Sequence, residues 1–265
     1  MKNLFLLLLV SVLSVSAFGQ KSFFNGKNLK NWDIHLGSPI TGYEELAKKA
    51  TPASTYQVVN IDGQKMIHIS GDIFASLATK AEYENYHLRL EFKWGEKVYG
   101  KRNSGLLYHS FGPFGVAFGT WMANIEHQLM HDNLGDTYLM ANTYCESKVV
   151  KSEDGKSFNY SPEGQLTSFS EGDNGRSVKK GKDAENALGQ WNTVDLYCFG
   201  QTSVHVVNGQ VVMINTNCSK VENNLKIPLT KGKIQIQSEG GEFFIRKIEI
   251  EKIKEIPSGL LKWGL

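Results

Sequence analysis

Residues 85–94, "NYHLRLEFKW", predict a β-strand because their apolar and polar side chains alternate strictly. A period of two places successive side chains on opposite faces of an extended strand, whereas a helix would need a period of 3.6. One face is apolar or aromatic and consists of Tyr86, Leu88, Leu90, Phe92 and Trp94. The opposite face consists of His87, Arg89, Glu91 and Lys93. We therefore predict a β-strand with one buried face and one polar face.

Later segments repeat this alternation and carry the turns that join antiparallel strands. Residues 202–217, "TSVHVVNGQVVMINTN", predict two strands joined by Asn208-Gly209, a pair typical of tight hairpin turns. Residues 232–253, "GKIQIQSEGGEFFIRKIEIEKI", predict another pair of strands that turns at Gly240-Gly241. Further strands are expected at residues 64–70 and 190–200.

Helical signals are almost absent. Only Gly42 to Ala50 ("GYEELAKKA") predicts a helix, and it is short. The polar segment from Lys148 to Gly189 is interpreted as a long surface excursion, because such length without structure is usually functional or mobile. Many strands with Gly and Asn turns predict an all-β fold, a two-sheet antiparallel jelly-roll sandwich. No repeat or linker divides it, so residues 20–265 are expected to form a single domain.

The N-terminus is typical of a secretory signal peptide. Lys2 precedes the apolar run Leu4–Val15, and Ala17-Phe18-Gly19 is a small-x-small cleavage site. We predict that residues 1–19 are removed and that the protein is periplasmic or secreted, with an uncleaved anchor as the alternative. The net charge is only +2 and the lysines are scattered, which favours neither nucleic acid nor a membrane surface as partner. The oligomeric state stays open.

Three cysteines, Cys145, Cys198 and Cys218, are too few for a disulfide framework. If one pair bridges, Cys198 with Cys218 is the best candidate, although sequence does not give their separation. CxxC and CxxH spacings are absent, which argues against a cysteine-ligated zinc site.

Residues 121–140, "WMANIEHQLMHDNLGDTYLM", concentrate the titratable side chains of the chain. On a strand, Glu126 and Gln128 share one face while His127 lies on the other. His127 and His131 raise a metal hypothesis together with Asp132, but four strand residues separate the two histidines by about 13 Å. We therefore predict no transition-metal site there and no cofactor; a structural calcium ion held by loop oxygens stays open without a motif.

Five segments resemble the DUF1080 family, also called the 3-keto-disaccharide hydrolase domain, in the order in which that family has them. They are "FFNGKNLKNWDIH" (23–35), "KRNSGLLYH" (101–109), "IEHQLMHDNLGDTYLM" (125–140), "GQWNTVDLYCFGQTSVHVVNGQVV" (189–212) and "KGKIQIQSEGGEFFIRKIEI" (231–250). The resemblance implies a concanavalin-like jelly roll in a secreted or periplasmic bacterial protein. It also implies cleavage of 3-keto-glycosides, so the expected partner is an oxidised carbohydrate.

The chain departs from the family pattern at three places. His109 stands where the family often has Arg, and Asn103 where it often has Asp. The Gly- and Phe-rich insertion Phe111–Thr120, "FGPFGVAFGT", is expected to form a substrate-facing loop.

A ketone at C3 of a sugar acidifies the C2 proton, so a single base can start elimination of the C1 substituent. Such a site needs a base near C2, a donor at the ketone oxygen and an acid for the leaving oxygen. We expect Glu126 to be the base, His109 to be the donor or acid, and Gln128 to position the sugar. Lys101 or Arg102 could also polarise the ketone, although surface cations are common.

Other residues are candidates for substrate binding. They are Asn103, Tyr108, His131, Asp132, Asp136, Tyr138 and Glu239, with Trp121 and Trp191 as further aromatic platforms. For each aromatic ring, packing in the core is the alternative. Two other functions stay open: a non-catalytic carbohydrate-binding protein, and a glycosidase that uses Glu126 with Glu239, whose carboxyls would then lie roughly 5–9.5 Å apart.

Overall fold

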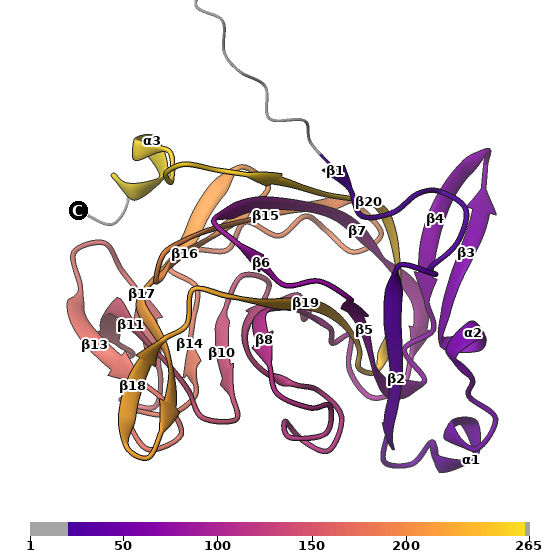
Figure 1. The fold of residues 1–265 in the computed structure, drawn as a ribbon, viewed down its shortest axis with the longest axis horizontal. Helices are drawn as coiled ribbons and strands as arrows, with labels where there is room; N and C mark the ends of the chain where they lie inside the picture. The colour runs from indigo at the N-terminus through magenta and orange to yellow at the C-terminus, as the bar shows by residue number, and fades with distance from the viewer. Residues whose placement is uncertain (1–20, 263–265) are drawn as a thin grey trace, which may run out of the picture.

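The computed structural model describes residues 21–262, which form two packed antiparallel sheets (Figure 1). The larger sheet has the order β12 (Phe158–Tyr160), β11 (Thr143–Lys151), β17 (Gln210–Glu222), β16 (Thr202–Val207), β15 (Asn192–Phe199), β7 (Tyr86–Val98), β20 (Gly241–Lys252), β4 (Gln64–Ile69) and β3 (Tyr56–Ile61). Beside β20, β11 and β17 lie the strands β1 (Lys21–Ser22), β13 (Gln165–Phe169) and β18 (Leu225–Pro228). The predicted signal peptide, residues 1–19, lies outside the described residues.

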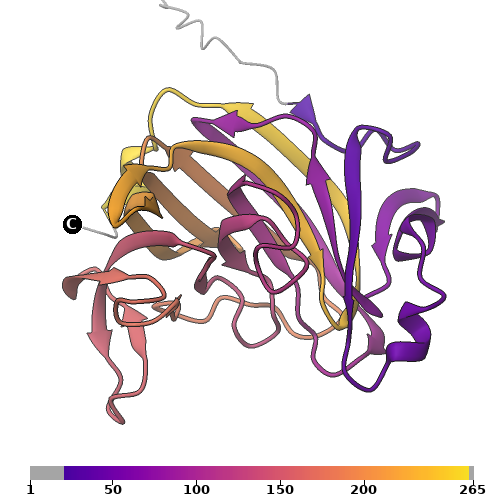
Figure 2. The same ribbon diagram turned by 60° about the horizontal axis from the view of Figure 1, so that its bottom comes forward.

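The smaller sheet packs against the larger one, and its outer face carries the loops seen at the front of Figure 2. Its order is β14 (Ser177–Val178), β10 (Thr137–Met140), β9 (Ala123–Gln128), β8 (Gly105–Phe111), β19 (Lys231–Ser238), β5 (Ile73–Thr79) and β2 (Trp32–Pro39), with β6 (Tyr83–Glu84) beside β19. Three single-turn helices are α1 (Glu44–Ala47), α2 (Pro52–Thr55) and α3 (Ser258–Leu261). The predicted two-sheet jelly-roll sandwich is confirmed, and the helix expected at residues 42–50 is reduced to α1.

Strand β7 confirms the alternation that predicted the fold. Its apolar residues, Tyr86 to Trp94 at every second position, are all buried in the core between the sheets. The polar face makes ion pairs across the larger sheet instead. Arg89 Nε lies 2.7 Å from Asp195 Oδ1, and His87 Nε2 lies 2.7 Å from the same oxygen.

The two glycine turns have different outcomes. The hairpin at Asn208-Gly209 joins β16 to β17, as predicted. Strands β19 and β20 exist as predicted, but they do not pair, because β19 lies between β8 and β5 while β20 lies between β7 and β4. The turn between them crosses from one sheet to the other. Gly240 permits this crossing: its φ is +99°, and a Cβ there would lie 2.9 Å from the Lys101 carbonyl oxygen.

The interpretation of residues 148–189 as a surface excursion is wrong in part. This segment contributes the end of β11 and the strands β12, β13 and β14, which extend the edges of both sheets. Short polar edge strands lack the apolar alternation by which buried strands are recognised, since one side of them faces water.

All three cysteines are free and buried, so Cys198 and Cys218 do not form the bridge considered from sequence. Among residues 21–262, no helix is long and apolar enough to cross a membrane.

Candidate functional site

A groove with a volume of about 590 Å³ lies on the face of the smaller sheet that points away from the core. Its polar lining comprises Lys101, Asn103, Glu126, Gln128, Asn133, Asp136, Thr137, Ser177, Lys179 and Glu239. Its apolar lining comprises Phe74, Phe118, Trp121, Met130, Tyr138 and Met140. Strands β9 and β10 supply five of the lining residues, namely Glu126, Gln128, Thr137, Tyr138 and Met140.

Strand β9 places Glu126 and Gln128 on the groove side, as its alternation predicts. Ile125 faces the core, and His127 also points inward, where its ring stacks on His205 with centroids 4.1 Å apart and planes at 5°. The predicted separation of Glu126 and Gln128 from His127 is confirmed.

The Glu126 side chain lies over Gly105. Any residue with a Cβ at position 105 would occupy the space of the Glu126 carboxyl. A Cβ at Gly105 would be 2.1 Å from Glu126 Oε1 and 2.4 Å from Gln237 Oε1. Both oxygens therefore approach one point above the floor. Neither oxygen has a hydrogen-bond partner within the protein, and both side chains are at most 1% exposed. Buried polar atoms are normally paired, so the unpaired atoms here indicate a surface prepared for a ligand.

Burial raises the pKa of the two central carboxyls. The pKa of Glu126 lies well above its usual range because the side chain is desolvated and because Glu239 and Asp136 carry negative charge nearby. Burial also raises the pKa of Glu239 to about 8. Near neutral pH the pair therefore keeps at least one proton that ordinary carboxyls would have lost. Such a pair can supply both a base and an acid.

Asp136 contributes to the groove as half of an ion pair. Its Oδ2 accepts a hydrogen bond from Lys179 Nζ at 2.9 Å, and its Oδ1 accepts one from the Lys180 backbone N–H at 2.8 Å. Lys179 Nζ also donates to Asn133 Oδ1 at 2.9 Å. Desolvation raises the pKa of Asp136, although these donors oppose the shift. Asp136 thus serves to hold the Lys179 ammonium at the groove.

The structure corrects the role expected for His109. A β-bulge between Tyr108 and Phe111 gives His109 a φ of +50° and breaks the alternation of β8. Its ring consequently turns into the interior against Tyr86 and Tyr108, 1% exposed, and does not line the groove. Burial lowers the pKa of His109 to about 4, which keeps the ring neutral. It is therefore neither donor nor acid for a sugar in the groove.

Tyr108 is also removed from the substrate-binding set. Its ring is fully buried in the core, and its hydroxyl lies 2.7 Å from Ser203 Oγ and 3.1 Å from His205 Nε2. Tyr138, by contrast, lines the groove. Of the other platforms considered, Trp121 lines the groove, while Trp191 lies between Lys93 and Arg246.

Arg102 is likewise misplaced by the prediction. It lines a different cavity together with Lys97 and Glu242, whereas its neighbours Lys101 and Asn103 line the groove. Successive side chains of an extended segment point to opposite sides, which explains the division. The Asn103 Oδ1 atom is buried and has no partner, so Asn103 joins the unpaired polar atoms of the site.

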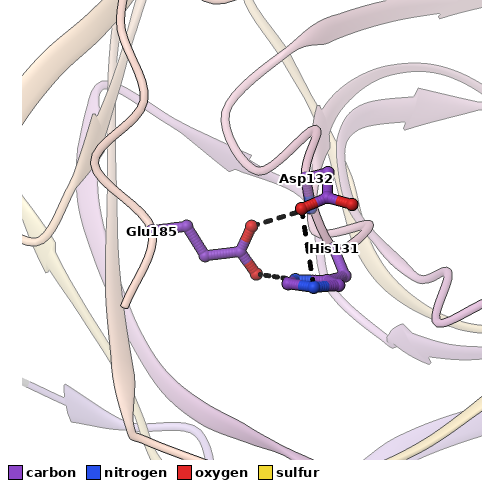
Figure 3. A group of neighbouring side chains, drawn as sticks. All are labelled: His131, Asp132 and Glu185. Atoms are coloured by element: carbon purple, nitrogen blue, oxygen red, sulfur yellow. Dashed lines mark hydrogen bonds and ion pairs between the residues drawn. The ribbon is translucent and has the colours of Figure 1, made fainter. Parts of the chain in front are cut away.

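His131 and Asp132 lie outside the groove lining and form a separate cluster with Glu185 (Figure 3). Potential ligand atoms of the three residues lie within 4.8 Å of one another, an arrangement that could hold a metal ion. Here, however, His131 Nδ1 lies 3.0 Å from Glu185 Oε1, and Glu185 Oε2 accepts the Asp132 backbone N–H at 2.8 Å. The ammonium of Lys180 donates to the Asp132 carbonyl at 2.8 Å and competes with a cation. The cluster ties Glu185 to the end of β9.

Several groove residues, among them Lys179 and Phe74, were not predicted from the sequence. Lys179 comes from the polar segment that carried no strand signal, so nothing in the sequence related it to Asp136. Phe74 belongs to β5, which was not recognised as a strand. Gln237 is not among the predicted site residues, although its side-chain oxygen approaches the same point above Gly105 as Glu126 Oε1.

The chain is similar to a known family and to solved structures. The model of the 3-keto-alpha-glucoside-1,2-lyase-like domain matches residues 19–251. A candidate glycosyl hydrolase from Parabacteroides distasonis ATCC 8503 has a TM-score of 0.52 at 20% identity, over 90% of this chain and 96% of that one. A β-glucanase from Bacillus licheniformis has a TM-score of 0.46 at 13% identity, over 89% of this chain and 99% of that one. No curated protein matches the sequence.

Replacement of Glu126 by Gln should stabilise the folded protein at alkaline pH. A carboxyl whose pKa is raised on folding contributes its full stability below pH 4.5, and that stability is lost as the pH rises through the folded-state pKa. An amide does not ionise, so Glu126→Gln avoids this loss. We expect a Tm about 2–4 °C higher than wild type at pH 8, as ~1 kcal/mol gives in a chain of this size.

Thermal unfolding followed by circular dichroism at pH 4.5 and pH 8 measures this difference. The exposed Glu163→Gln is the matched control and should change neither midpoint. A Glu126→Gln variant less stable than wild type at pH 8 would contradict a raised pKa of the buried Glu126 carboxyl.

Proposed function

The chain belongs to the 3-keto-alpha-glucoside-1,2-lyase-like family, and from this premise we propose that it cleaves the C1–O bond of a 3-keto-glycoside bound in the groove. The solved relative from Parabacteroides distasonis, a candidate glycosyl hydrolase, has the same fold. The observation that carries the proposal is the buried, unpaired Glu126 carboxyl on the groove floor, close enough to Glu239 for the charge on Glu239 to raise its pKa.

Glu126 is proposed to remove the proton from C2 of the keto sugar. The C2–H electron pair enters the C2–C3 bond and gives an enolate at the C3 oxygen. When the carbonyl reforms, a double bond forms between C1 and C2 and the C1–O bond breaks. A base with a raised pKa suits this step, because a carbon acid needs a stronger base than an ordinary carboxylate.

Glu239 is proposed to give its proton to the departing oxygen. The two carboxyls interact and therefore lose their protons in two steps. After the first step, we propose that the charge lies on Glu126, which accepts the C2 proton, and that the remaining proton lies on Glu239. One proton thus enters the carboxyl pair and one leaves it, and the products are a sugar enone and the free alcohol. Water can add to the enone in a later step, which would complete a net hydrolysis.

Cationic and amide side chains are proposed to hold the substrate. Lys101 lines the groove and would stabilise negative charge on the C3 oxygen in place of His109. Gln237, Gln128 and Asn103 offer amide groups for sugar hydroxyls, and those of Gln237 and Asn103 have unpaired atoms. Hydroxyl groups that form these bonds would satisfy the unpaired atoms of the site. We also propose, on the N-terminal sequence, that the enzyme acts outside the cytoplasm.

Replacement of Glu126 by Gln should lower kcat for a 3-keto-glucoside by at least about 10³-fold, since an amide cannot accept the C2 proton. Release of the alcohol, followed with purified protein, measures the rate. Glu163→Gln again serves as the control and should retain the wild-type rate. Near-normal turnover by Glu126→Gln would remove Glu126 from the mechanism. Binding of an unoxidised glycan, without turnover of any 3-keto-glycoside by wild type, would instead favour a carbohydrate-binding protein.

The pH profile of kcat/KM should be bell-shaped. At low pH both carboxyls are protonated and no base is available; at high pH, once both have ionised, no acid is available. Glu239→Gln removes the second ionisation, so its profile should rise with pH to a plateau at a lower maximum. Initial rates between pH 4 and pH 10 test this, and an unchanged alkaline limb in Glu239→Gln would exclude Glu239 as the acid.

Replacement of Gly105 by Ala should impair catalysis far more than folding. The new Cβ would displace the flexible ends of Glu126 and Gln237 rather than any backbone atom. A carboxylate misplaced by about 1 Å can cost ~10²-fold in rate, and we expect a loss of that size in kcat/KM. Gly172→Ala is the control, because nothing lies within 4 Å of its Cβ position. Full activity of Gly105→Ala would show that the position of the carboxyl is not critical.

A further inference from the structure

The groove changes character along strand β9. At the Gln128 end, the neighbouring positions Asn103, Gly105 and Glu239 make a polar surface. At the other end, Met140 pairs with Asn124 on the adjacent strand, and Trp121 lies close by. Glu126 is at the boundary, because Leu107 and Tyr138 flank it on the two neighbouring strands.

The apolar end is a cage of aromatic rings. Its rings belong to Phe74, Phe118, Trp121 and Tyr138. Trp121 belongs to a hydrophobic cluster that is separate from the core between the sheets and also contains Leu107, Ala117 and Met140. Phe74 and Tyr138 pack against this cluster. An apolar surface that lines a cavity instead of filling it is suited to an apolar guest.

The rings meet at steep angles rather than forming a flat platform. Phe118 and Trp121 have centroids 6.5 Å apart and planes at 75°, and Phe74 and Trp121 are 5.7 Å apart at 67°. Phe118 and Tyr138 are 6.4 Å apart at 47°. A further aromatic ring can add to such an arrangement through offset and edge-to-face contacts.

The four rings of the cage offer a second sugar only the Tyr138 hydroxyl as a hydrogen-bonding group. The ring nitrogen of the cage, Trp121 Nε1, already donates to the Ala75 carbonyl at 3.0 Å. Sugar hydroxyls buried against Met140 and Phe74 would lose water without gaining partners from these side chains, which is unfavourable.

The Phe111–Thr120 insertion closes this end of the groove. Trp121 and Ala117 anchor the loop, with the Ala117 backbone N–H donating to the Trp121 carbonyl at 3.0 Å. Phe118 remains 53% exposed at the mouth, with the Arg176 guanidinium carbon 5.2 Å from its ring centroid. A large exposed aromatic ring beside an apolar cavity is typical of a binding surface.

We propose that the apolar end is the aglycone subsite and that the preferred substrate carries an aromatic aglycone on its 3-keto sugar. This inference rests on the proposed function, with the keto sugar at the Glu126 boundary and its C1 substituent directed toward Phe118. One end of the groove would then bind the sugar through hydrogen bonds to its hydroxyls, and the other end would bind the aglycone through contacts with its aromatic ring.

The test compares kcat/KM for benzyl and methyl 3-keto-glucosides, which both release alcohols. We expect benzyl to be preferred by about tenfold. Phe118→Ala should lower that preference about five- to tenfold, and Phe118→Tyr should keep it. Phe114→Ala is the control, because Phe114 belongs to the same loop but stacks on His35 and does not line the groove. Equal rates for both substrates, or a preference for a 3-keto-disaccharide, would overturn the proposal.

Calorimetric binding of unoxidised benzyl and methyl glucosides separates this inference from the proposed function. Tighter binding of benzyl glucoside that is lost in Phe118→Ala supports the aromatic subsite even if no 3-keto-glycoside is turned over. Equal binding of the two glucosides overturns the subsite even if 3-keto-glycosides are cleaved.

Discussion

Successive residues of a strand must face opposite ways, and in β9 this constraint joins the core to the candidate groove. Ile125 and His127 are packed inside, where the His127 ring stacks on His205. That packing fixes the strand. Glu126 lies on the opposite side, where its Oε1 atom accepts no hydrogen bond from residues 21–262. The carboxyl is therefore positioned by what lies behind it, and Gly105 provides the space in which it lies.

The buried carboxyls of Glu126 and Glu239 oppose folding, and they give the groove two acids with raised pKa values. Desolvation raises the pKa of both Glu126 and Glu239, because the charged forms are stabilised less inside the protein than in water. Asp136 differs, since the Lys179 ammonium and the Lys180 backbone N–H donate hydrogen bonds to its carboxyl. Among residues 21–262, Glu126 and Glu239 have no such donors to offset their desolvation, so their burial lowers the stability of the folded protein. Such destabilising groups are expected at functional sites rather than in structural ion-pair networks.

Alternation in the sequence was sufficient to predict the sandwich and the side of the sheet on which Glu126 and Gln128 lie. It failed where the backbone departs from regular strand geometry. The bulge at His109 turns two consecutive side chains inward, and no local residue pattern marks it. The pairing of β19 and β20 was also unpredictable, because a glycine turn can close a hairpin or cross between sheets. Lys179 and Glu185 reach residues about fifty positions away, and only the tertiary structure relates them.

The three free cysteines are protected from oxidation as long as the protein is folded. Cys145, Cys198 and Cys218 are fully buried, and burial raises the pKa of each thiol, that of Cys218 to about 12. Native molecules thus present almost no thiolate, the form that reacts with oxidants. An unfolded chain would expose all three thiols at once. In an oxidising compartment, cross-linking would then trap molecules that open, so the packing around these thiols protects the protein against irreversible loss as well as against unfolding.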